Sequence, residues 1–127
     1  MENDGQIVLI VDDEPGMCWA LQNLLAAEGF DSRSVQTGEA ALQLIETMEF
    51  TIALLDVMLP DMSGFELARR VKTVVPSIRI FMVSGYYYKD DVDIQSAVEE
   101  GLVEGFISKP FLHEDVIGVV KGAGADG

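Results

Sequence analysis

The segment that decides the fold is residues 7–13, whose sequence is IVLIVDD. Five apolar residues in a row, followed by two aspartates, are typical of a short strand that is covered on both faces, as in a parallel sheet. Similar apolar runs occur at residues 52–55, 78–83 and 105–107, and a weaker strand is expected at residues 32–35. The chain therefore contains five candidate strands.

Helical spacing of apolar residues follows each of these strands. The first helix is expected to begin near Pro15 and to stop at Gly29, and the second to begin behind Thr37 as its N-cap. The third ends before Pro76, because proline cannot continue a helix. The last two helices are expected over residues 90–100 and 113–121.

Regular alternation of strand and helix predicts an α/β fold. We expect a flavodoxin-like (βα)5 architecture, with an open parallel five-stranded sheet in the order 2-1-3-4-5 and helices on both faces. Residues 1–121 would form the domain. Residues 122–127 are small and are predicted to be a frayed tail or the stub of a linker.

The composition narrows the function. The 127 residues include 22 Asp and Glu against 8 Lys and Arg, a net charge of −14, which disfavours direct binding to nucleic acid or to an anionic membrane. Hydrophobic residues make up 49% of the chain, too many for an acidic disordered protein. No signal peptide or membrane span is evident, so we expect a cytoplasmic protein. The single Cys18 excludes an internal disulfide and a thiolate zinc site, and the single His113 excludes a histidine-based metal site.

Polar residues of particular kinds follow the strong apolar runs: Asp12 and Asp13, Asp56, Ser84, and Lys109. The carboxyl ends of parallel strands lie along one edge, so we expect these side chains to converge on one crevice. Each residue alone could be an ordinary turn or cap residue. The coincidence of the set favours function.

Three neighbouring carboxylates repel one another, and one lysine neutralises only one of them. A hard divalent cation such as Mg²⁺ would relieve this repulsion and, with the lysine, could stabilise the oxygens of a phosphoryl group. An aspartate carboxylate is itself a nucleophile for phosphoryl groups. The spacing alone leaves open which aspartate attacks.

The chain from Ile7 to about Lys121 resembles a response-regulator receiver domain of two-component signalling. The resemblance rests on four motifs in order, VDDEP at 11–15, LDVMLPDMSG at 55–64, VSG at 83–85 and KPF at 109–111. It implies that Asp56 accepts a phosphoryl group. It also implies that Asp12, Asp13, Asp56 and the backbone carbonyl of Met58 hold Mg²⁺.

The same resemblance implies a switch. Lys109 would bind a phosphoryl oxygen, Ser84 would move toward the phosphoryl group, and Phe106 would change rotamer in response. The donor would be a sensor histidine kinase or a histidine phosphotransfer protein. The output partner, basic or neutral, would bind the face formed by the fourth helix, the last strand and the fifth helix, and a phosphorylation-dependent dimer is also compatible. The domain would catalyse only its own phosphorylation and dephosphorylation, with no external turnover substrate.

Finer features suggest further hypotheses. The segment around Cys18 and Trp19 is reminiscent of receivers of nitrogen-regulatory, enhancer-binding activators. Tyr86, with Met58, could screen the phosphoryl group from water. A haloacid-dehalogenase-like phosphatase is the enzyme alternative, but that family places a second aspartate where this chain has Met58. A flavin carrier is also disfavoured, because three carboxylates would repel its phosphate.

Overall fold

The computed structural model describes residues 7–85, 92–109, 111 and 113–126. The strands in these residues are β1 (Ile7–Val11), β2 (Asp31–Val35), β3 (Ile52–Asp56), β4 (Arg79–Ser84) and β5 (Gly105–Ser108). The helices are α1 (Pro15–Ala27), α2 (Gly38–Leu44), α3 (Gly64–Val74), α4 (Val92–Glu99) and α5 (His113–Asp126). Strand and helix alternate from end to end, as the sequence predicted.

All neighbouring strands are parallel, and their order is β2-β1-β3-β4-β5, which confirms the predicted topology. The strand β1 is internal, and its residue Ile10 lies opposite Ser34 of β2 on one side and Leu54 of β3 on the other. The carboxyl ends of β1, β3 and β4 therefore lie at the same edge of the sheet.

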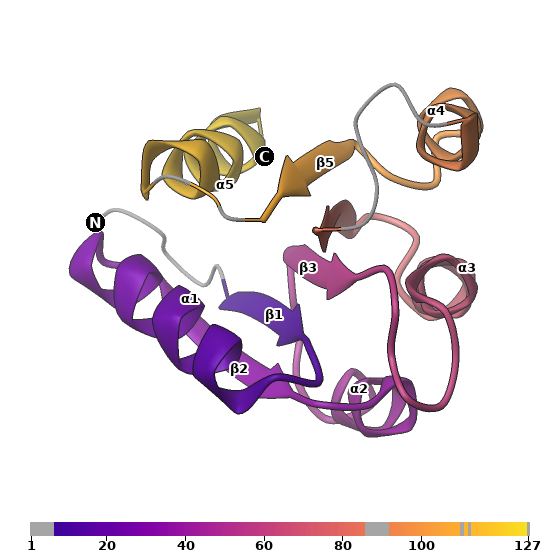
Figure 1. The fold of residues 1–127 in the computed structure, drawn as a ribbon, viewed down its shortest axis with the longest axis horizontal. Helices are drawn as coiled ribbons and strands as arrows, with labels where there is room; N and C mark the ends of the chain where they lie inside the picture. Colours follow the sequence, from indigo (N-terminus) through magenta and orange to yellow (C-terminus); the bar gives the residue numbers. More distant parts are fainter. Residues whose placement is uncertain (1–6, 86–91, 110, 112, 127) are drawn as a thin grey trace.

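Helices cover both faces of the sheet. Figure 1 shows α1 and α5 on one face, and α2, α3 and α4 on the other. Side chains of β1 alternate between two cores: Val8 and Ile10 pack toward α1 and α5, whereas Leu9 and Val11 pack into the core of the other face. Because both sides are buried, the apolar run in β1 is continuous rather than alternating.

Several predicted helix ends are confirmed. Pro15 is the first residue of α1, and Gly29, with a φ of 88°, follows its end. Thr37 caps α2, since its side chain accepts a hydrogen bond from the backbone N–H of Ala40. Pro76 lies just beyond α3. These local signals fix where each helix stops and the chain turns back to the sheet.

The predicted end of the last helix is wrong, because α5 continues past Lys121 to Asp126. Glycines at 122 and 124 weaken a helix, but the alanines at 123 and 125 are the best helix formers, and extending an existing helix costs little. Residues 86–91 lie outside the described part of the chain, so the hypothesis on Tyr86 is not tested. None of the helices within the described residues is long and apolar enough to cross a membrane.

Candidate functional site

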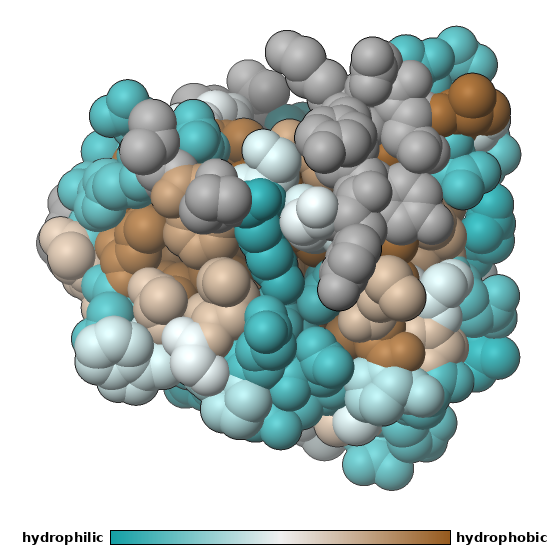
Figure 2. All heavy atoms as spheres, viewed as in Figure 1, coloured by the Kyte–Doolittle hydropathy of each residue, from teal (hydrophilic) through white to brown (hydrophobic). Residues whose placement is uncertain are grey.

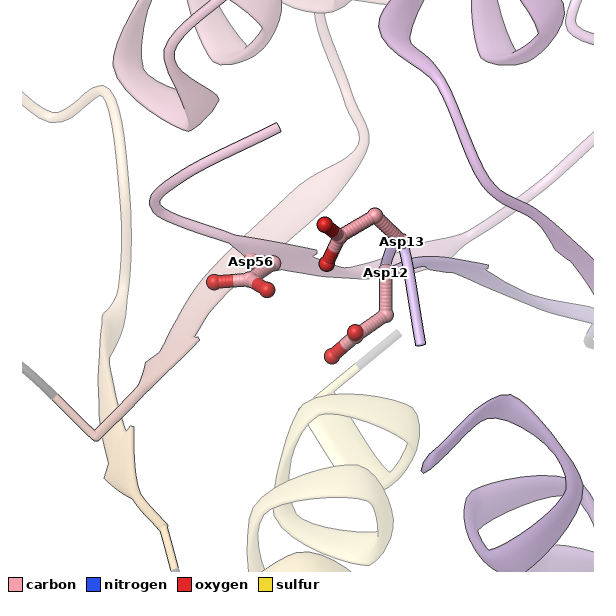
Figure 3. Close-up of side chains that lie close together, drawn as sticks. All are labelled: Asp12, Asp13 and Asp56. Atoms are coloured by element: carbon pink, nitrogen blue, oxygen red, sulfur yellow. The ribbon is translucent and has the colours of Figure 1, made fainter. Parts of the chain in front are cut away.

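Three carboxylates meet at the carboxyl edge of the sheet. Asp12 and Asp13 directly follow β1, and Asp56 is the last residue of β3. One oxygen from each lies within 4.8 Å of the other two, and Figure 3 shows the three side chains grouped together. Asp12 and Asp56 are buried, whereas Asp13 is exposed. The predicted convergence of these residues is confirmed.

Lys109 brings positive charge to this cluster from the end of β5. Its Nζ lies 2.8 Å from Oδ2 of Asp12 and 3.4 Å from Oδ2 of Asp56. The backbone N–H of Lys109 donates to the carbonyl of Ser84, which fixes the start of the side chain beside β4. The lysine side chain is only 15% exposed, so it bridges the two buried carboxylates with little competition from water.

The electrostatics of the buried pair are unbalanced. Burial, and then the charge of Asp12, raise the pKa of Asp56, although Lys109 and the backbone N–H of Met58 oppose this effect. Burial alone would lower the pKa of Lys109, but its hydrogen bonds and charge interactions with Asp12 and Asp56 outweigh burial and raise it. Lys109 therefore stays charged and still neutralises only part of the cluster.

The donor set suits a hard cation. Carboxylate oxygens are the ligands that Mg²⁺ prefers, and three of them converge here. The cluster borders a cleft of about 410 Å³, large enough for a hydrated ion beside a phosphoryl group. The cleft is lined by Asp13, Glu14, Asp56, Met58, Ser84, Gly85 and Lys109. The residues present therefore fit the predicted cation.

Glu14 is a cleft residue that the sequence reasoning did not select. Its Oε1 lies 3.6 Å from Nζ of Lys109, and its backbone N–H donates to Oδ1 of Asp12. Its position directly after Asp13, in the run of three acids that follows β1, is the signal that could have identified it. The exposed carboxylate adds a further negative charge at the mouth of the cleft.

Ser84 and Phe106, the predicted switch residues, lie on neighbouring strands. Ser84 ends β4, is 1% exposed and lines the cleft. Phe106 lies in β5, opposite Met82 of β4. It is half-buried and packs against the core shared by α2, α3 and α4. The serine is thus in the site, and the aromatic ring connects the same pair of strands to the helical layer.

Gly64 holds the backbone behind Asp56. This first residue of α3 is buried, and its N–H donates to the carbonyl of Val57 at 2.6 Å. A Cβ built on Gly64 would meet the backbone carbonyl oxygen of Asp56, and Cε of Met82 at 2.7 Å. Only glycine permits this close approach of α3 to the end of β3, a requirement that the sequence reasoning also missed.

Known proteins resemble this chain along most of its length. The chain is 38% identical over 103 residues to the "Cyclic di-GMP phosphodiesterase" of Thermotoga maritima, which covers 81% of this chain and 27% of that protein. It is 30% identical over 123 residues to "DNA-binding response regulator MtrA" of Mycolicibacterium smegmatis, covering 95% of this chain and 51% of that protein. The chain thus spans about half, or less, of these relatives.

Solved structures agree with the sequence matches. The crystal structure of a CheY-like response regulator receiver domain protein from Methanospirillum hungatei JF-1 has a TM-score of 0.87 and 27% identity, covering 95% of this chain and 94% of the other. Nothing in these matches supports the phosphatase alternative.

A family model described as the response regulator receiver domain matches residues 8–121, from β1 into α5. The acidic cluster and the bridging lysine come from three of the four motifs on which the sequence resemblance rested, those at 11–15, 55–64 and 109–111. The chain belongs to the response regulator receiver domain family, whose members are phosphoacceptors in two-component signalling.

Proposed function

We propose that Asp56 is the phosphoacceptor of this receiver domain and that Asp12 and Asp13, with Asp56 and the backbone carbonyl of Met58, hold Mg²⁺. The observation that carries the proposal is the meeting of three carboxylates within 4.8 Å, with an ammonium group bridging the two buried ones. Asp56 is favoured over Asp12 as the nucleophile because it lines the cleft, whereas buried Asp12 does not. Asp13 also lines the cleft, and Asp56 is favoured over it because Lys109 Nζ lies 3.4 Å from Asp56 Oδ2 and because the family resemblance implies that Asp56 accepts the phosphoryl group.

In the proposed reaction, a carboxylate oxygen of Asp56 attacks the phosphorus of a phosphohistidine. A P–O bond forms, the P–N bond breaks, and the electron pair returns to the imidazole nitrogen. Lys109 and Ser84 would hold the phosphoryl oxygens, because both line the same cleft as Asp56. Asp12, Asp13 and Asp56 would hold Mg²⁺, which would supply positive charge for the phosphoryl oxygens. Hydrolysis of the aspartyl phosphate by water would reverse the modification.

The partners follow from the family and from the surface charge. We infer a histidine kinase or phosphotransfer protein as the donor. The face formed by α4, β5 and α5 would contact the output partner, through Phe106 as the relay. Exposed acids gather on and after α4, at Asp93, Glu99, Glu100 and Glu104, and favour a basic or neutral partner over direct contact with nucleic acid.

The remaining features of the proposal concern the whole protein. We infer that the receiver domain of residues 1–121, whose last helix continues beyond this boundary to Asp126, acts in the cytoplasm. We also infer that it has no external turnover substrate, and that the phosphorylated form could dimerise. In the relatives named above the receiver-like region is only part of a longer chain, so the output activity belongs to the complete protein.

Intact-mass spectrometry tests the assignment of Asp56. The protein is incubated with acetyl phosphate and Mg²⁺, in parallel with Asp56→Asn and with Asp31→Asn, an exposed aspartate in β2 that lies away from the cleft. We expect a single phosphoryl adduct in the wild type and in Asp31→Asn, and none in Asp56→Asn or without Mg²⁺. An adduct that persists in Asp56→Asn would refute the assignment.

A further inference from the structure

Asp61 connects the loop between β3 and α3 to helix α2, which is distant in sequence but adjacent in space. It lies in the segment of residues 57–63 that joins β3 to α3, and its two carboxylate oxygens accept hydrogen bonds from the backbone N–H groups of Gly38 and Glu39, each at 2.9 Å. These are the first two residues of α2. The N–H groups at the start of a helix have no partner within the helix, and an anionic acceptor suits them.

The helix does not depend on Asp61 for a cap. Thr37, the residue just before α2, already accepts a hydrogen bond from Ala40 N–H at 3.1 Å. The ordinary local cap is therefore present, and Asp61 adds a second one from a loop more than twenty residues away in sequence. The two hydrogen bonds of Asp61 therefore hold the loop against α2, whereas the Thr37 cap acts only within the end of the helix.

The base of this loop is already closed. The N–H of Met58 donates to Oδ1 of Asp56 at 3.2 Å, Met58 and Ser63 form an antiparallel bridge, and Gly64 bonds to Val57. These contacts all lie near the strand end. They leave the far part of the loop to be held by something outside it.

Two contacts with α2 hold that far part. One is the pair of hydrogen bonds made by Asp61. The other is the side chain of Met62, which lies so close to Gly38 that a Cβ there would approach its Sδ to 2.6 Å. Figure 1 shows the connection between β3 and α3 extending beside α2 before α3 begins.

We propose that Asp61 is a positioning residue for the acidic cleft. By anchoring the far part of the loop to α2, it holds the segment that returns to Ser63 and so supports the bridge between Ser63 and Met58, which keeps the backbone of Met58 beside Asp56 before any ligand binds. This inference rests on the proposed function, in which Met58 supplies a metal ligand. A loop that is already ordered loses less conformational entropy when the cation binds, so the anchor increases Mg²⁺ affinity.

The test compares two caps of the same helix. Asp61→Ala removes the distant cap and Thr37→Ala the local one, so both weaken α2, but only the first releases the loop. Glu39→Gln removes one negative charge from the same place while keeping its backbone N–H, and it controls for long-range charge. Asp61→Asn, which retains one acceptor oxygen, replaces Asp61→Ala if the alanine variant does not fold.

Mg²⁺ affinity is measured by titration calorimetry at about 0.15 M ionic strength, where charges farther apart than roughly 8 Å are largely screened. We expect Asp61→Ala to weaken binding roughly tenfold, near the lower end of the effect of residues that support metal ligands. Thr37→Ala and Glu39→Gln should stay close to the wild type. Equal weakening in Asp61→Ala and in either control would overturn the inference.

Amide hydrogen exchange of the metal-free protein gives a second readout. Exchange in residues 57–63 should become faster in Asp61→Ala and not in Thr37→Ala. Unchanged exchange in Asp61→Ala refutes the anchor even if the metal affinity falls. If the wild type binds no Mg²⁺ but the exchange result holds, the proposed metal site fails while the anchoring of the loop stands.

Discussion

Replacing Gly64 with alanine tests how the end of β3 is held. The added methyl group would collide with the backbone carbonyl of Asp56, and would lie 2.9 Å from Cα of Val57 and 2.7 Å from Cε of Met82. The methionine side chain can rotate away, but the two backbone atoms cannot move without shifting Asp56 itself. We therefore expect Gly64→Ala to lower both the free energy of unfolding and the rate of phosphorylation.

The magnitude follows from these contacts. Inserting one carbon into a well-packed region costs about 1–3 kcal/mol, and contacts with backbone atoms place Gly64→Ala toward the upper end. Alanine recovers about 0.5–1 kcal/mol through its higher helix propensity. The net loss of unfolding free energy should be about 2 kcal/mol, a substantial fraction of the stability of a domain of this size.

Urea denaturation followed by circular dichroism measures this loss. The matched control is Gly118→Ala in the middle of α5, where the residue is exposed and a Cβ meets nothing within 4 Å. That variant should gain up to about 1 kcal/mol. A Gly64→Ala variant within about 0.5 kcal/mol of the wild type, and phosphorylated at the normal rate, would show that the close approach does not constrain Asp56.

Three further predictions concern the charged residues. Lys109→Met leaves Asp12 and Asp56 without their shared ammonium group, so the free energy of unfolding of the metal-free protein should fall by about 3 kcal/mol in urea denaturation, the lower end of the cost of removing one partner of a buried ion pair. Saturating Mg²⁺ should restore part of this loss; no restoration would contradict the metal site. Asp56→Asn should unfold at higher urea than wild type at pH 8. The pKa of Asp56 is raised in the folded protein. The stability of the wild type therefore falls as pH rises from the ordinary carboxyl pKa through the raised one, and the stabilities of the two proteins should become equal at low pH. Hydrogen bonds from Gly38 and Glu39 lower the pKa of Asp61. The contribution of Asp61 to the free energy of unfolding is therefore present above the ordinary carboxyl pKa and is lost as pH falls through the lowered value. The difference in stability between the wild type and Asp61→Asn should disappear in acid. A difference that does not change with pH would argue against these hydrogen bonds.

The sequence predicted the sheet well because burial on both faces leaves a distinct pattern. The run at 7–11 became β1 with the same bounds, since an internal parallel strand needs apolar side chains at every position. The end of α5 was less predictable. Glycine is an unreliable stop signal within a helix whose neighbouring residues favour continuation, and the chain contains both kinds of residue there.

The candidate site also contains residues that could be predicted from the sequence and residues that could not. Asp12, Asp13, Asp56, Ser84 and Lys109 could be predicted to meet, because topology alone brings the ends of parallel strands together. The roles of Gly64 and Asp61 could not be predicted from the spacing. Each depends on how closely one segment approaches another: the start of α3 at Gly64 against the end of β3, and the loop at Asp61 against α2. Contacts of this kind are set by tertiary packing and leave no periodic pattern.

The site is identified by which acidic residues of the chain are buried, and not by how many acidic residues the chain has. Of the 22 acidic residues, Asp12 and Asp56 are the carboxylates buried in the described part of the chain. Burying two like charges beside a single ammonium costs folding free energy, as the raised pKa of Asp56 shows. Apolar or amide side chains at these strand ends would avoid that cost. Such a local conflict between stability and sequence is typical of a functional site, and here a bound cation would resolve it. The net charge of −14 therefore says little about the site by itself, because most of that charge is on the surface.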